Sequence, residues 1–75
     1  MPRVPRIVRT VPSGPIVRAD EPIAVIARLR WHRGEVTDAS ALAVAWTSQA
    51  VQIEWTTPSG DRRTDWVPAA DVRRA

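Results

Sequence analysis

The aromatic residues constrain the fold of this chain more than any other feature. All four are tryptophans, and each lies in or beside a short apolar run: Trp31, Trp46, Trp55 and Trp66. Residues that favour turns separate most of these runs. The spacing predicts one compact domain of short elements over residues 23–75, with the indole rings supplying much of the core.

Nothing in the composition offers a covalent or metal cross-link for so small a domain. The chain has 75 residues, no Cys and a single His, His32. A disulfide is therefore excluded, and a structural zinc site lacks its four nitrogen or sulfur ligands. We expect no cofactor. Stability should come from apolar packing, with self-association as the remaining way to bury more surface.

Three segments alternate between apolar and polar residues with a period of two, which is typical of strands with one buried face. In residues 23–31 the inward set is Ile23, Val25, Ala27, Leu29 and Trp31. In residues 50–57 it is Val51, Ile53 and Trp55. The segment 62–67 forms a further strand, anchored by either Trp66 or Val67.

Residues 36–47 are ambiguous between strand and helix. As a strand, they place Leu42, Val44 and Trp46 on one face and three alanines on the other. As a helix, Ser40 would cap the first turn, and the alanines favour it by propensity. Only three residues separate this segment from the next strand, which suits a hairpin, so we favour a strand.

Turn signals join these elements. Gly34 is the expected position of positive φ in the turn after the first strand, and Pro58-Ser59-Gly60-Asp61 predicts a tight turn. Residues 69–74 should form a single helical turn, with Val72 packing back on the domain.

The first 22 residues form a separate Pro- and Arg-rich arm. They contain five of the seven prolines, so we expect neither a helix nor a central strand there. An open alternative for Ile7, Val8 and Val11 is a short edge strand that docks on the domain. Arg3, Arg6 and Arg9 recur every three residues, so a polyproline helix would align them on one face, although this spacing can also arise by chance.

The order of strands and turns predicts an all-β fold, a small barrel of four or five strands with a short C-terminal helical turn. From Arg28 to Arg74 the pattern resembles SH3-like barrels, including Tudor and KOW-type modules. It is also similar to small uncharacterised proteins of high-GC bacteria and their mobile elements, which share a W…G…AWT…V.V.W…WV.A..VRR pattern. That second resemblance implies a bacterial, cytoplasmic protein and no known activity.

Catalysis has little support in the sequence. There is no nucleophile-elbow, P-loop or Rossmann glycine pattern, and the acidic residues show no paired spacing. His32 lies beside Arg33 near a turn, where a solvated surface role is expected. We therefore predict a protein that is not an enzyme and has no small-molecule substrate. No apolar run reaches the ~20 residues of a membrane span, so we expect no membrane contact and a cytoplasmic location.

Binding is better supported, because the basic residues are unevenly distributed. The net charge is +3, every basic residue is Arg, and residues 1–18 carry four Arg and no acid. Our first hypothesis is a nucleic-acid-binding module, for either DNA or RNA, in which guanidinium groups contact phosphates and an indole stacks on a base. The arginines concerned are Arg3, Arg6, Arg9, Arg28, Arg30, Arg33, Arg62, Arg63, Arg73 and Arg74.

Two alternatives remain open. The interleaved acids can pair with the same arginines and leave an ordinary mixed-charge surface. The second hypothesis is a protein-interaction or self-association module with an exposed apolar or Trp-bearing surface. The tryptophans can accordingly be core, stacking platform or aromatic cage.

Overall fold

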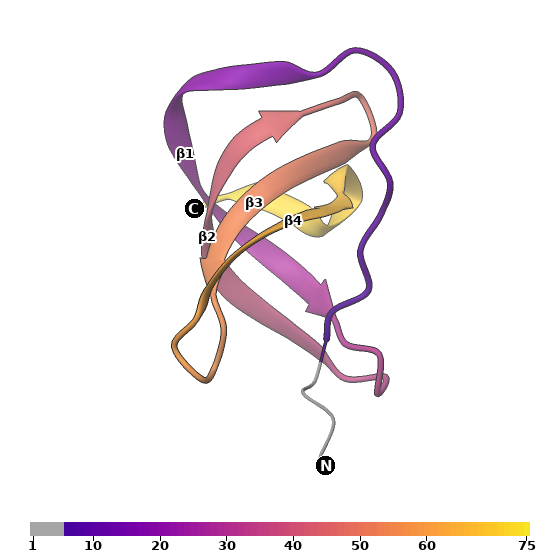
Figure 1. The fold of residues 1–75 in the computed structure, drawn as a ribbon, viewed down its shortest axis with the longest axis vertical. Coiled ribbons are helices and arrows are strands. Elements are labelled where there is room, and N and C mark those ends of the chain that lie inside the picture. The colour runs from indigo at the N-terminus through magenta and orange to yellow at the C-terminus, as the bar shows by residue number, and fades with distance from the viewer. Residues whose placement is uncertain (1–5) are drawn as a thin grey trace.

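A computed structural model describes residues 6–75, and Arg3 lies outside this range. The expected all-β fold is confirmed as one antiparallel sheet (Figure 1), with strand order β4-β3-β2-β1-β5. The elements are β1 (Val17–Arg30), β2 (Val36–Trp46), β3 (Ala50–Thr56), β4 (Arg62–Pro68), the 3₁₀ turn η1 (Ala69–Asp71) and β5 (Val72–Arg74). Residues 36–46 are thus a strand, as favoured from the short connection.

The alternation in β1 and β3 places side chains as the sequence predicts. Val25, Ala27 and Leu29 are buried in β1, and Ile53 and Trp55 are buried in β3. In β4 the anchor is Val67, which is 2% exposed, while Trp66 is half-buried. The strands therefore share one inner face, and Leu29, Ile53 and Val67 are its largest fully buried side chains.

Strand β2 turns its small residues inward. Ala41, Ala43 and Ala45 are buried, whereas Leu42 is exposed and Trp46 half-buried on the opposite face. Larger side chains from β1 and β3, among them Leu29, Ile53 and Trp55, belong to the same buried cluster as Ala41 and Ala43 of β2. Propensity alone would have assigned the bulky set to the core.

The tryptophans do not gather in one interior, contrary to the expectation of a core built on indoles. Trp55 is buried, and Trp31 packs against the core while remaining half-buried. Trp46 and Trp66 are also half-buried, on the outward faces of their strands. Aliphatic side chains and alanines make up the rest of the buried core around Trp55.

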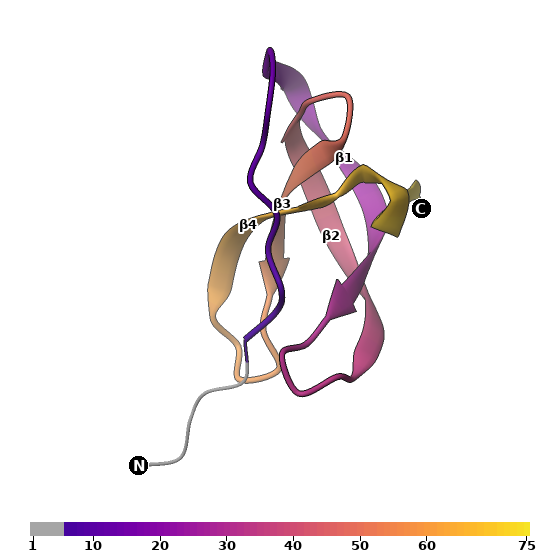
Figure 2. The same ribbon diagram turned by 90° about the vertical axis from the view of Figure 1, so that its right-hand side faces the viewer.

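The N-terminal arm docks on the domain through Ile7, which is 5% exposed. Ile7 forms an antiparallel bridge with Trp31, and the Val8 amide donates to the Arg30 carbonyl at 2.6 Å. The Thr10 amide donates to the Trp66 carbonyl of β4 at 2.9 Å. The segment therefore runs between the end of β1 and β4, as Figure 2 shows.

The rest of the expected arm departs from the prediction, because β1 begins at Val17, before Ile23. Its pairing with β2 shifts register between Arg18 and Ile23, and Pro22 falls within this irregular stretch. A proline is tolerated there because no ladder hydrogen bond is required of it.

The expected C-terminal helical turn is present as η1, but it is shorter than the predicted residues 69–74. The 3₁₀ turn ends at Asp71, and Val72 begins a short strand paired with β1, with Ala27 opposite Val72. Val72 packs on the core as expected. The turns at Gly34 and Gly60 have φ of 96° and 94°, which confirms the positive φ expected at Gly34.

Candidate functional site

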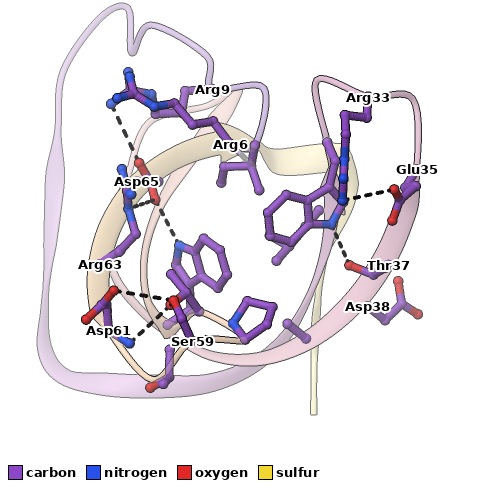
Figure 3. A pocket seen from close by; sticks show the side chains of 18 residues that line it. Arg6, Arg9, Arg33, Glu35, Thr37, Asp38, Ser59, Asp61, Arg63 and Asp65 are labelled. Carbon is purple, nitrogen blue, oxygen red and sulfur yellow. Dashed lines mark hydrogen bonds and ion pairs between the residues drawn. The ribbon is translucent and has the colours of Figure 1, made fainter. Parts of the chain in front are cut away.

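A pocket of about 540 Å³ opens at the end of the sheet where the arm, the end of β1 and the β3–β4 turn meet. Its apolar wall includes Ile7, Leu29, Trp31, Trp55 and Pro58. Four arginines and four acidic residues also line it: Arg6, Arg9, Arg33, Arg63, Glu35, Asp38, Asp61 and Asp65. Figure 3 shows Arg9, Arg63 and Asp65 on one side, and Glu35, Thr37 and Asp38 on the other.

Two tryptophans build the wall of this pocket. The rings of Trp31 and Trp55 meet edge to face, with centroids 5.9 Å apart and an interplanar angle of 77°. The Trp31 Nε1 donates to Thr37 Oγ1 at 2.9 Å. The paired contact and the hydrogen bond fix the orientation of Trp31, which is the only one of the two rings with substantial exposure.

Asp65 is the residue of the site that the sequence analysis missed. Its carboxylate accepts a hydrogen bond from Trp55 Nε1 at 2.9 Å, and the residue is 3% exposed. The alternation of residues 62–67 contained the signal for its burial, because a strand that turns Val67 inward also turns Asp65 inward. The alternative anchor, Trp66, would have left Asp65 on the solvent face.

Two arginines face this buried carboxylate without closing on it. Arg9 Nη1 lies 3.8 Å from Asp65 Oδ1, and Arg63 Nε lies 3.8 Å from Asp65 Oδ2. Both distances exceed the ~2.7–3.2 Å of a hydrogen bond, so the guanidinium donors are not taken up by Asp65. Their side chains are 58% and 40% exposed and can meet a ligand. We call Asp65, Arg9 and Arg63 the open cluster.

The carboxylates on the opposite wall are engaged by other arginines. Glu35 pairs with Arg33 at 3.2 Å. Asp38 pairs with Arg28 at 3.6 Å and with Arg73 at 3.4 Å, and neither of these arginines lines the pocket. Arg6, in contrast, forms no ion pair within residues 6–75. Positive charge therefore prevails on the side formed by the arm and β4.

A second ion pair, between Arg30 and Asp71, is closed by hydrogen bonds. Arg30 donates two hydrogen bonds to Asp71, each of 3.0 Å, in a bidentate pair. These hydrogen bonds, and then the charge of Asp71, raise the pKa of Arg30 above its ordinary value. The pair ties η1 to the outer face of β1. We call it the closed cluster.

The expected arginine patch is only partly assembled. Arg73 and Arg74 lie opposite Ile26 and Val25 on β1, so β5 brings them near Arg28. Arg62 and Arg63 lie on β4, at the other edge of the sheet order, and Arg62 pairs with Glu54 at 3.9 Å. Seven of the ten arginines in residues 6–75 form ion pairs. The expected single surface is thus divided, and only Arg6, Arg9, Arg33 and Arg63 share the pocket.

Comparisons with protein-family models, with curated proteins and with solved structures find no match for this chain. Within residues 6–75, no group of three or more His, Asp or Glu side chains is placed to hold a metal ion. That same part of the chain contains no helix of the length and hydrophobicity needed to cross a bilayer.

Proposed function

We propose that the protein is a non-enzymatic module that binds nucleic acid through this pocket. The observation that carries the proposal is the open cluster, in which Arg9 and Arg63 approach one buried carboxylate and keep their donors available. Arg6 also lines the pocket, and it forms no ion pair with any residue from 6 to 75. Arginines that retain exposed donors are suited to the oxygens of a phosphate backbone.

The proposal narrows the set of arginines expected from the sequence. Arg33 lines the pocket but pairs with Glu35 at 3.2 Å. The other expected arginines within residues 6–75 do not line the pocket: Arg28, Arg30, Arg62, Arg73 and Arg74. The binding residues are therefore Arg6, Arg9 and Arg63, with Trp31 beside them. A cytoplasmic location would give such a module access to its ligand.

We also infer that the architecture is an SH3-like barrel of the kind found in Tudor and KOW-type modules. Its support is the path of residues 6–10, which donate backbone hydrogen bonds to the end of β1 and to β4. The arm would then occupy the space between the two ends of the curved sheet. The suggested origin in high-GC bacteria rests on the sequence pattern alone.

A titration with labelled DNA and RNA oligonucleotides tests the function. We expect binding at low salt that weakens as salt rises, because phosphate contacts release counterions. Arg63→Gln should weaken binding and lower the salt slope by about one. Arg18→Gln removes the same charge from an exposed residue outside the pocket and should leave the affinity nearly unchanged. Absence of binding at low salt would refute the proposal.

The outer face of β2 favours a second candidate, a protein-interaction or self-association module. Leu42 is 36% exposed, Val17 and Val36 are each 51% exposed, and Trp46 lies opposite Val17 across the β1–β2 pair. Sedimentation at increasing concentration tests it. A dimer that Leu42→Asp abolishes supports this candidate, and a strictly monomeric protein that captures no partner counts against it.

A further inference from the structure

We propose that the pocket seats one unpaired base of a single strand, with the adjoining phosphate held between Arg9 and Arg63. This inference rests on the proposed function and specifies its ligand. Three observations support it: the position of Trp31, the size of the pocket, and the excess of positive charge on the side formed by the arm and β4.

The position of Trp31 selects against a duplex. Its indole is half-buried in the wall of a concave site, where its Nε1 is held by Thr37 and its ring meets Trp55. Bases within a duplex are stacked on both faces, so they cannot reach a recessed indole. A base of a single strand can leave its stack and place its π face on the ring.

The dimensions and the lining fit one base. A volume of about 540 Å³ lies within the ~300–1,000 Å³ of sites that enclose a small organic group. Pro58 and Leu29 supply further apolar surface around Trp31. Thr56 and Asp61 add oxygen atoms to the lining, and these can accept hydrogen bonds from the amino or imino groups of a base.

The phosphate position follows from the open cluster. Arg9 and Arg63 lie 3.8 Å from the two different oxygens of Asp65, so they flank this buried carboxylate. Two guanidinium groups over one carboxylate leave an excess of one positive charge. An anion on the solvent side of this pair gains charge-assisted hydrogen bonds from both arginines. Arg6, from the same arm as Arg9, can contact the next phosphate.

Three labelled probes of equal length test the inference with the wild-type chain. They are a single strand of about ten nucleotides, the same strand annealed to its complement, and an abasic strand that keeps every phosphate. We expect the intact single strand to bind about tenfold more tightly than either other probe, with a change in tryptophan fluorescence for that probe alone. Equal binding of the abasic strand would overturn the base seat while leaving the proposed function standing. Absence of binding by all three would overturn both.

Variants provide a second, independent readout. Trp31→Leu should lower the affinity for the intact strand about tenfold and leave the affinity for the abasic strand unchanged. Trp46→Leu removes an equally half-buried indole from the outer face of β2, outside the pocket, and should change neither. Because Trp31 packs on the core, folding of each variant is checked by circular dichroism. An unchanged preference for the intact strand in folded Trp31→Leu would overturn the role of the indole.

Discussion

The open cluster and the closed cluster use the same two residue types in opposite ways. In the closed cluster, Arg30 meets Asp71 through two hydrogen bonds of 3.0 Å on the outer face of β1. In the open cluster, Asp65 is buried and turned toward Trp55, and Arg9 and Arg63 stop at 3.8 Å. An ion pair therefore does not by itself occupy the N–H donors of an arginine. What matters is whether the carboxylate occupies the guanidinium donors.

The difference has a physical origin in the acceptor. One oxygen of Asp65 already accepts a hydrogen bond from Trp55 Nε1. The Asp65 side chain points inward, which keeps its carboxylate away from the surface. The arginines reach it only from the rim. Asp71 is the last residue of η1 and presents both oxygens to Arg30.

The largest expected effect is on stability at the open cluster. Asp65→Ala leaves the buried Trp55 Nε1 without an acceptor and opens a space beside the ring, so we expect a loss of about 3 kcal/mol in the free energy of unfolding. Asp65→Asn keeps an acceptor oxygen and should lose much less. Asp71→Ala should also lose less, because its partner Arg30 is 52% exposed and can be solvated when the pair is removed. Urea denaturation measures all three, and an equal loss for Asp65→Ala and Asp71→Ala would contradict the distinction.

The second effect concerns the anchor that brings Arg9 to the pocket. Ile7→Ala removes buried apolar volume between β1 and β4, with an expected loss of about 2 kcal/mol. The same variant should weaken oligonucleotide binding, because Arg9 and Arg6 lose their fixed positions. Val8→Ala is the control, since Val8 is 45% exposed. If binding is unaffected in folded Ile7→Ala, docking of the arm does not organise the site.

A smaller effect is the difference between the two clusters in their contribution to oligonucleotide affinity. Arg9→Gln should reduce the affinity for a single strand about fivefold, which corresponds to ~1 kcal/mol. Arg30→Gln should leave the affinity unchanged, because its donors are already occupied by Asp71 outside the proposed binding residues. Fluorescence anisotropy at fixed salt compares the two. Equal losses would indicate that general positive charge, and not the open cluster, attracts the ligand.

The smallest expected effect is the pH response of the closed cluster. The pKa of Arg30 is raised by its hydrogen bonds to Asp71 and then by that charge, so the pair stabilises the fold below the ordinary pKa of arginine and loses this contribution only as pH rises through the raised value. The difference in stability between wild type and Arg30→Gln should therefore stay constant from neutral pH to about pH 10. Denaturation at several pH values measures it, and a decline within this range would contradict the assignment.

Much of the fold follows from local patterning. The period of two in β1 and β3 identifies their inner faces, since successive side chains in a strand point to opposite sides. The turns at Gly34 and Gly60 follow from residues that tolerate positive φ. The choice of strand for residues 36–46 followed from the length of the next connection. These features depend on near neighbours in the chain and can be recognised without knowing the sheet.

Contacts between segments far apart in the chain were visible only in the tertiary structure. The inward alanines of β2 depend on the volume left by β1 and β3, and the burial of Ile7 depends on the gap between β1 and β4. The open cluster joins Arg9 of the arm with Asp65 and Arg63 of β4, residues whose pairing no local period encodes. The sequence alone supplied the arginines and predicted the central parts of β1 to β4, but not the early start of β1 or the strand β5. Long-range packing determined which guanidinium donors are occupied and which face the pocket. That depends on whether segments far apart in the chain bring an arginine to 3.0 Å from its carboxylate, as in the closed cluster, or only to 3.8 Å, as in the open cluster.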